Sequence, residues 1–275
     1  MVQTFAKVLL VNTRGEILFL RRSDSDRNRP GGWDFPGGSM EAGEDPFDGV
    51  IRETFEEAGV RLDDPQLVFV APRTGEYGVG CWLLYLTYVP DDITITLSEE
   101  HSAFVWWTPE QALANSGYPA HQELLDFIVA NHLLDKQVKK NVTCRTLLVN
   151  EAGELLILRR SATDPFYAGS WDLPGGRVEA GERLLQAALR ETKEECGISI
   201  DTPALVYGTS NPRHEGTGSW LFYHARIAAD TPIKLSDEHD EYRWIPTADL
   251  PQYTDYVVLL RMHAFATTYR LYNAV

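Results

Sequence analysis

The stretch GGSMEAGEDPFDGVIRETFEEAGV, from Gly37 to Val60, places seven acidic side chains in a segment with the pattern of a helix and a glycine-rich lead-in. Glu53, Glu56 and Glu57 are spaced i, i+3 and i+4, which brings their side chains together on one helical face. Like charges at this spacing destabilise an isolated helix by about 0.2–0.5 kcal/mol per pair. The crowding therefore needs an opposite charge to offset it.

The same acidic spacing recurs 138 residues later (175 − 37 = 138), in GGRVEAGERLLQAALRETKEECGI from Gly175 to Ile198. Between residues 9 and 59, 28 of 51 positions are identical to their partners at this offset. Shared strand and helix patterning alone would not give so many identities, so the chain is a tandem duplication of a whole domain. We expect one domain over 1–137 and a second over 138–275, each long enough to bury its own core.

The charge of the chain bears on its partners. The net charge is −15 and the isoelectric point about 4.9. Affinity for a polyphosphate backbone comes largely from Lys and Arg, so we expect no binding of long nucleic acids. A small phosphate-bearing substrate would need a cation between it and the acidic protein.

Cysteine content and hydropathy bear on the compartment. Cys81, Cys144 and Cys196 are too few and too scattered for a disulfide framework or a zinc site, which favours a reducing compartment. The first residues, MVQTFAKVLLV, lack the features of a signal peptide, and the longest apolar run, around VGCWLLYLTYV, is too short to span a bilayer. We therefore expect a cytoplasmic protein with no membrane partner.

The secondary-structure pattern is the same in both copies. Two strands flank a glycine turn, and the acidic helix begins near Glu44 or Glu182 and ends at Gly59 or Gly197. Its apolar positions are expected to face a core, leaving the glutamates on another side. Three further strands and a closing helix follow, with the closing helix over residues 121–134 or 256–269. Strands mixed with two helices per copy predict an α+β fold with a mixed sheet.

The clustered carboxylates suggest a metal site. Hard divalent cations take oxygen ligands, and Mg²⁺ typically uses one or two protein carboxylates together with substrate phosphate oxygens. Such a cation would offset the repulsion and bridge an anionic substrate to an acidic protein. Arg52 precedes Glu56 by four residues, and Arg190 precedes Glu194 likewise, so each arginine can hold a carboxylate.

The two acidic segments carry a family resemblance. The order Gly38, five residues, Glu44, seven residues, then RETFEEAGV from Arg52 resembles the Nudix box, and the second copy matches it from Gly176 through Glu182 to RETKEECGI. Thr54 and Thr192 are the only departures, at a position where the family prefers an aliphatic residue. The resemblance implies a Nudix fold in each half, with a mixed β-sheet sandwiched between α-helices.

The resemblance also implies roles for individual residues, with Mg²⁺ or Mn²⁺ as the cofactor. The positions that match its main metal ligands are Glu56, Glu57, Glu194 and Glu195. A backbone carbonyl near Gly37 or Gly38, and near Gly175 or Gly176 in the second copy, often completes the coordination in the family. Glu53 and Glu191 match a further ligand or the general base. Some members add a glutamate six residues before a tryptophan, as Glu100 and Glu238 stand here, although both could equally be loop charges.

Aromatic and basic residues near each box are candidates for binding the substrate. Trp33 and Trp171 could form the wall on which a nucleobase stacks, or could be core aromatics. Arg22 and Arg160 could hold phosphate, or could be surface charges at the end of a strand.

The sequence as a whole predicts a tandem Nudix hydrolase. It would cleave a pyrophosphate bond in a nucleoside diphosphate or triphosphate derivative, in a house-cleaning or nucleotide-pool role. The alternative is a catalytically silent Nudix-like nucleotide sensor. We expect a monomeric chain that forms an internal pseudo-dimer, with both halves active and with different substrate preferences, because the loops 24–32 and 162–170 differ.

Overall fold

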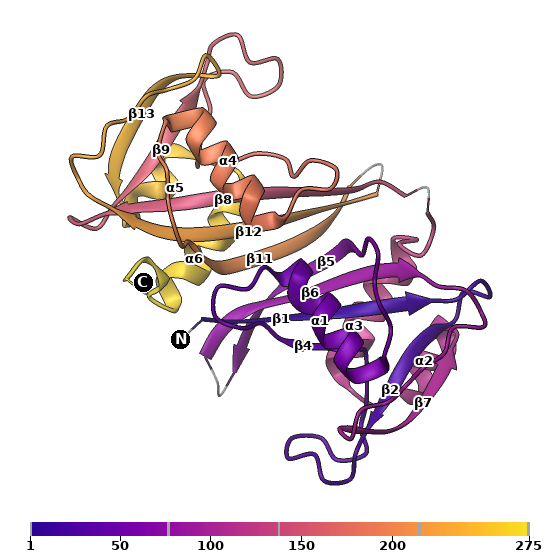
Figure 1. Ribbon diagram of the computed structural model, residues 1–275. Coiled ribbons are helices and arrows are strands. Elements are labelled where there is room, and N and C mark those ends of the chain that lie inside the picture. The colour runs from indigo at the N-terminus through magenta and orange to yellow at the C-terminus, as the bar shows by residue number, and fades with distance from the viewer. Residues whose placement is uncertain (1, 76–77, 137, 214–215, 274–275) are drawn as a thin grey trace.

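The computed structural model describes residues 2–75, 78–136, 138–213 and 216–273, and each half of the chain forms one sheet with helices against it (Figure 1). The elements of the first half are β1 (Val2–Val11), β2 (Ile17–Arg22), β3 (Trp33–Asp34), β4 (Gly37–Ser39), α1 (Pro46–Ala58), β5 (Gln66–Gly75), β6 (Gly78–Tyr88), β7 (His101–Trp107), α2 (Pro109–Asn115) and α3 (Pro119–Ala130). Those of the second half are β8 (Lys140–Asn150), β9 (Glu154–Arg160), β10 (Trp171–Asp172), α4 (Leu184–Cys196), β11 (Ala204–Arg213), β12 (Gly216–Ile227), β13 (His239–Pro246), η1 (Thr247–Asp249), α5 (Leu250–Tyr253), α6 (Val257–Thr268) and η2 (Leu271–Asn273).

The two sheets share one topology. The first runs β3-β2-β1-β6-β5, with β4 beside β1 and β7 beside β2, and the second runs β10-β9-β8-β12-β11, with β13 beside β9. The long central pairs β1–β6 and β8–β12 are parallel, and the other strand pairs are antiparallel. This mixed pairing with flanking helices confirms the predicted α+β class in both halves.

The central strands are buried on both faces. Val8 and Leu10 of β1 belong to the same core cluster as Val50 of α1, whereas Leu9 belongs to the cluster of Leu125 in α3. Because a helix covers each face of the sheet, the strand is a continuous apolar run rather than an alternating one. The sheet thereby holds α1, and the glutamates on it, at a fixed place.

The two halves pack directly against each other, with β11 against β5 and β6 (Figure 1). Tyr85 and Tyr223, which occupy equivalent positions, lie in one core cluster that includes residues of both halves. Ser210 Oγ accepts a hydrogen bond of 2.8 Å from the backbone N–H of Val70. The interface is therefore an apolar core with a few polar links.

Equivalent helix starts also meet across the interface. The Asp45 carboxylate accepts a 3.1 Å hydrogen bond from the N–H of Leu185, and the Arg183 guanidinium lies 3.0 Å from Asp48. The same guanidinium lies 3.7 Å from the ring centroid of Phe47. Asp45 and Arg183 are related by the repeat offset (45 + 138 = 183), so the halves meet face to face about an approximate twofold axis.

The prediction of two helices per copy was incomplete. The first half contains the additional helix α2, whose start is a capping box in which Thr108 accepts from the N–H of Gln111 and the Gln111 side chain accepts from the N–H of Thr108. The second half contains the short helix α5 at the corresponding place. Helix α3 also begins two residues before the predicted start, at Pro119, which suits the first helical position.

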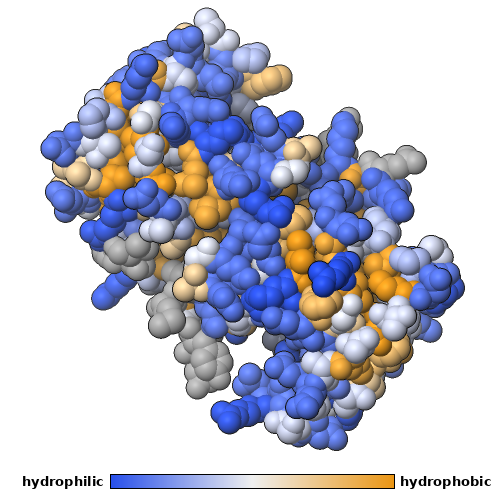
Figure 2. Space-filling view, viewed as in Figure 1, coloured by the Kyte–Doolittle hydropathy of each residue, from blue (hydrophilic) through white to orange (hydrophobic). Residues whose placement is uncertain are grey.

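The surface in the view of Figure 2 is mainly hydrophilic, with hydrophobic residues gathered within each half. Among the described residues, no helix has the length and apolar character needed to cross a membrane.

Candidate active site

Helix α1 has strong start and stop signals, whereas α4 shares only the stop signal, a left-handed glycine at Gly197. Helix α1 begins after Asp45, whose side chain accepts a 2.9 Å hydrogen bond from the N–H of Phe47, and Pro46 takes the first helical position. It ends at Gly59, which adopts the left-handed conformation that favours glycine. The predicted helix boundaries are confirmed to within about two residues.

A single arginine in each half holds three glutamates. The Arg52 guanidinium binds Glu44 through two bonds of 2.9 Å, Glu53 through one of 2.9 Å and Glu56 through one of 3.1 Å. Two-pronged pairing of this kind is the strong form of an arginine–carboxylate bond. The repulsion within the acidic helix is therefore already offset by a charge of the chain itself.

The second half repeats this network closely. The Arg190 guanidinium binds Glu182 at 2.8 and 3.0 Å, Glu191 at 2.9 Å and Glu194 at 3.1 Å. The supporting role predicted for these arginines thus extends beyond the i,i+4 partner to the glutamate before the helix.

The last glutamate of each cluster is buried, contrary to the expectation that the glutamates lie away from the core. Glu57 and Glu195 are 6% and 5% exposed, and each accepts a 2.8 Å hydrogen bond from a glycine N–H, that of Gly37 or Gly175. Burial raises the pKa of Glu57 to about 7, against the attraction of Lys7. The glutamate side chain can be buried because the glycine N–H satisfies one of its carboxylate oxygens.

The glycines beside the glutamates are required by close packing. Gly37 has φ 118°, and a Cβ there would lie 2.3 Å from the carbonyl oxygen of Ala6. A Cβ on Gly38 would lie 2.3 Å from a carboxylate oxygen of Glu53, and one on Gly176 would lie 2.4 Å from a carboxylate oxygen of Glu191. The glycine-rich lead-in therefore lets the backbone approach the carboxylates directly.

The chemistry of the donors fits a hard divalent cation, because carboxylate and backbone carbonyl oxygens are the ligands that such a cation takes. The carbonyls already have partners: Lys7 donates to the carbonyl of Gly37, and the N–H of Cys144 donates to that of Gly176. Among the described residues, no three acidic, histidine or cysteine side chains form a ready-made cation cage. Arg52 and Arg190 hold the glutamates instead, so a cation would have to draw them away from these arginines.

A buried histidine that the sequence analysis did not select faces each buried glutamate. His101 Nε2 lies 3.9 Å from Glu57 Oε1, and His239 Nε2 lies 3.9 Å from Glu195 Oε1. Burial lowers the pKa of both histidines to about 4. Their recurrence at the repeat offset, in SEEH and SDEH, was the available signal.

The glutamates just before these histidines are placed differently. Glu100 and Glu238 are exposed, and their backbone carbonyls accept 2.8 Å hydrogen bonds from the N–H groups of Ser23 and Ser161. Glu100 and Glu238 immediately precede β7 and β13, whose first residues are the buried histidines His101 and His239. Their predicted role in catalysis stays a prediction.

A buried cation and a partner carboxylate complete each site, and these too were missed from the sequence. Lys7 Nζ lies 3.4 Å from Asp34 and donates to the carbonyl of Phe35. Burial opposes ionisation of Asp34, but Lys7 and His121 outweigh it and hold the pKa of Asp34 well below its usual range. The signal was weak, because the equivalent of Lys7 is an arginine.

The arginine in the second half makes fewer bonds. Arg145 donates to Asp172 at 2.8 Å, whereas its Nε and Nη1 atoms are buried without a hydrogen-bond partner. It is 8% exposed. Unpaired donors on a buried cation are costly unless an acceptor arrives, so this side chain favours an anion beside it.

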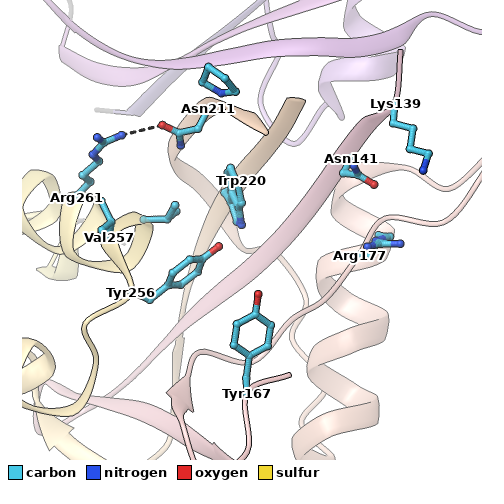
Figure 3. A pocket seen from close by; sticks show the side chains of 11 residues that line it. Lys139, Asn141, Tyr167, Arg177, Asn211, Trp220, Tyr256, Val257 and Arg261 are labelled. Carbon is cyan, nitrogen blue, oxygen red and sulfur yellow. Dashed lines mark hydrogen bonds between the residues drawn. The ribbon is translucent and has the colours of Figure 1, made fainter. Parts of the chain in front are cut away.

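A cleft of about 540 Å³ opens beside the second box. Its lining includes Gly176, Arg145, Asp172 and two predicted substrate-binding residues, Trp171 and Arg160. A wider hollow of about 880 Å³ adjoins it and shares the residues Asn141, Tyr167, Arg177, Trp220, Tyr256 and Val257 (Figure 3).

The equivalent predicted residues of the first half have similar partners in the chain. Trp33 packs against a core cluster, with its ring centroid 5.0 Å from that of Trp107, and Arg22 is paired with Asp26 at 2.8 Å and with Asp34 at 3.1 Å. In the second half Trp171 likewise packs against a core cluster, with its ring centroid 5.7 Å from that of Tyr253, and Arg160 is paired with Asp164 at 3.0 Å and lies 3.9 Å from Asp172. Trp171 and Arg160 differ in that they also line the cleft, and the substrate-binding role stays a prediction in both halves.

Comparison with known proteins identifies Nudix proteins as relatives of both halves of the chain. A family model described as NUDIX domain matches residues 2–127 and again residues 139–262. An uncharacterized Nudix hydrolase of Pseudomonas aeruginosa is 38% identical over 101 residues, which cover 36% of this chain and 59% of that protein. The CTP pyrophosphohydrolase of Escherichia coli is 31% identical over 121 residues, 44% of this chain and 87% of that protein.

Solved structures resemble the chain one half at a time. The crystal structure of a MutT protein from Methanosarcina mazei is 30% identical and covers 50% of this chain and 99% of its own, with a TM-score of 0.40.

Proposed function

The chain belongs to the Nudix family, and on this basis we propose that it hydrolyses a pyrophosphate bond in a nucleoside diphosphate or triphosphate derivative, with Mg²⁺ or Mn²⁺ as cofactor. The observation that carries the proposal is the buried glutamate of each box, Glu57 or Glu195, held against a glycine N–H with a raised pKa. Strongly perturbed carboxylates grouped at one site favour catalysis over a merely structural role.

The metal would be held by glutamates of the box, namely Glu53, Glu56 and Glu57 in the first half and Glu191, Glu194 and Glu195 in the second. A bound divalent cation supplies charge neutralisation on the pyrophosphate oxygens and makes attacking water more acidic. Arg52 and Arg190 orient the first two of these carboxylates in each half and would remain on Glu44 and Glu182, where the pairing is two-pronged.

For the general base we propose Glu191 in the second half, and Glu53 by equivalence in the first. Burial raises the pKa of Glu191, and a carboxylate with a raised pKa takes a proton from water more readily at neutral pH. Its carboxylate lies against the backbone of Gly176, a residue that lines the cleft. His239 is neutral near pH 7, so it would position Glu195 rather than carry charge.

The substrate class follows from the family and from the site. The CTP pyrophosphohydrolase of Escherichia coli acts on a nucleoside triphosphate, and the cleft beside the second box combines aromatic rings with arginines. We propose a nucleotide-pool or house-cleaning role, with domains at 1–137 and 138–275 acting in one chain as an internal pseudo-dimer.

A product analysis tests the proposal. The full chain is incubated with Mg²⁺ and a panel of nucleoside triphosphates, dinucleotides and nucleotide sugars, and the products are identified by chromatography and phosphate release. We expect cleavage between phosphates and its loss in the double variant Glu57→Gln/Glu195→Gln. Glu151→Gln, an exposed residue in the β8–β9 turn, is the matched control and should behave as wild type. A folded double variant with full turnover would refute the site assignment.

A further inference from the structure

The two halves have the same loop before the box but present different side chains from it. In the first half the N–H of Arg29 donates to Asp26 Oδ1 at 2.7 Å, and in the second the N–H of Tyr167 donates to Asp164 Oδ1 at 2.7 Å. Positions 29 and 167 are thus equivalent both in sequence (29 + 138 = 167) and in backbone geometry. A difference between them is a difference of side chain alone.

In the first half the arginine covers the aromatic surface beside the site. The Arg29 guanidinium lies 3.9 Å from the ring centroid of Tyr118, donates to the carbonyl of Trp33 at 2.5 Å, and lies 3.7 Å from Asp34. A second aromatic neighbour, His121, stands edge-on to the same ring at 4.9 Å. The Arg29 guanidinium therefore covers the face of the Tyr118 ring, on which a planar ligand would otherwise stack.

In the second half two tyrosines line open space: Tyr256, the equivalent of Tyr118, and Tyr167, the equivalent of Arg29. Tyr167 is 61% exposed and Tyr256 is 36% exposed, and both line the cleft whose wall includes Trp220. Figure 3 shows both tyrosines pointing into the space before Trp220. Exposed aromatic side chains gathered around a cleft suit a planar, apolar face such as a nucleobase.

The charges around the second cleft are also specific to that half. Arg177 and Arg261 line the hollow, where their first-half equivalents are Ser39 and Glu123. Arg145 contributes the buried guanidinium whose Nε and Nη1 atoms have no hydrogen-bond partner. Lys7 in the first half instead donates hydrogen bonds to two backbone carbonyls and lies beside Asp34. The cleft and the hollow are lined by five cationic side chains and two carboxylates, namely Lys139, Arg145, Arg160, Arg177 and Arg261 against Asp172 and Asp255. In a chain of net charge −15, this local excess of cations favours an anionic ligand.

We propose that the two halves have divided roles: the C-terminal half binds the nucleotide, with its base among Tyr167, Tyr256 and Trp220 and its phosphates toward Arg145 and Arg177, while Arg29 closes the same position of the N-terminal half. This inference rests on the proposed function for the identity of the ligand. It replaces the expectation of two active halves with different substrate preferences by one binding half and one half that chiefly supports it.

Ligand binding tests this division without relying on turnover. The probe is the non-hydrolysable nucleotide α,β-methylene ADP, titrated into the full chain with Mg²⁺ and followed by calorimetry. We expect one site per chain in the wild type. Tyr167→Arg, which installs the first-half residue at an exposed position, should weaken binding about tenfold or more, because a stacking surface is lost. Arg29→Tyr should add a second, weaker site.

A matched pair of charge exchanges provides the control. Arg261→Glu installs the first-half residue in the hollow that adjoins the binding cleft and should weaken binding several-fold. Glu123→Arg makes the reverse change in the first half and should leave the wild-type site unchanged. Thermal melting establishes that each variant is folded.

The outcomes separate this inference from the proposed function. Two equal sites in the wild type, or no effect of Tyr167→Arg on a single site, would overturn the division of roles even if the chain hydrolyses nucleotides. No binding of the probe at millimolar concentration would overturn it as well. A single site that responds as expected, in a chain that hydrolyses nothing in the panel, would uphold the division and refute the hydrolase.

Discussion

Glu195→Gln is expected to stabilise the metal-free protein, by an amount that depends on pH. Glu195 is 5% exposed, and burial raises its pKa from 4.5 to about 8. Glutamine keeps the shape and can still accept the 2.8 Å hydrogen bond from the N–H of Gly175, but it carries no charge to bury. The variant therefore removes the desolvation free energy of a buried charge, which the wild type bears only when the carboxylate is ionised.

The sign follows from proton binding. Because the folded pKa is raised, the folded state retains a proton that the unfolded state releases between about pH 4.5 and 8. The stability linked to this proton is fully present below pH 4.5 and is lost as the pH rises through about 8. A pKa difference of about 3.5 corresponds to about 5 kcal/mol at about 1.4 kcal/mol per unit, and relaxation toward water reduces this to about 2–3 kcal/mol.

Urea denaturation in EDTA at pH 4 and pH 8.5 measures the effect. We expect the free energies of unfolding of variant and wild type to agree within about 0.5 kcal/mol at pH 4, and the variant to be about 2–3 kcal/mol more stable at pH 8.5. Glu194→Gln, a neighbour whose side chain is 59% exposed, is the matched control and should change little at either pH. A Glu195→Gln variant that is less stable than wild type at both values would show that the carboxylate is a structural group and refute the reasoning.

Three further outcomes are expected. Arg190→Lys should lose the two-pronged bond to Glu182 and lower the melting temperature by a few degrees, corresponding to about 1 kcal/mol, with turnover reduced at least tenfold; wild-type kinetics would exclude a positioning role. Arg183→Ala should cost about 0.5–1 kcal/mol in urea, because its contacts to Asp48 and Phe47 join the halves, and no change would mean that the apolar interface alone sets their packing. Mg²⁺ affinity, measured by calorimetry, should rise from pH 6 to 8.5 because protons compete for Glu57 and Glu195, and a flat profile would place the cation elsewhere.

The sequence predicted the parts of the structure that local patterns determine. The acidic helix was expected between Glu44 and Gly59, and the structure has it over Pro46–Ala58, because capping residues and a terminal glycine specify helix ends. The duplication was readable because both copies share the acidic spacing and the terminal glycine, although Arg183 and Leu184 replace Asp45 and Pro46 at the start of the second helix. Helix α2 was missed although Thr108 and Gln111 form a capping box, which is a recognisable signal.

Contacts across the sheet could not be predicted in the same way. The inward turn of Glu57 depends on a donor at Gly37, and its neighbours Lys7 and His101 come from strands far away in the sequence. Periodicity places a residue on a helix face but does not identify the group that will meet it. The two site cations differ in type between the copies, so the repeat itself gave no warning of Lys7 and Arg145.

The difference between the halves was also beyond sequence patterning. The loops were known to differ, but a turn held by Asp26 or Asp164 can direct a side chain inward or outward. Only the packing of Arg29 on Tyr118 distinguishes a closed position from an open one.

Metal-dependent cleavage of a phosphate–phosphate bond is the central claim, and one rate measurement tests it most directly. The initial rate of hydrolysis of the best substrate is measured with the full chain in Mg²⁺, after excess EDTA, and after Mg²⁺ is restored. Because the glutamates that would carry the reaction, Glu191, Glu194 and Glu195, need a cation between them and the phosphates, we expect the rate to vanish in EDTA and to return with Mg²⁺. An undiminished rate in EDTA would contradict the metal site and with it the assignment of the glutamates.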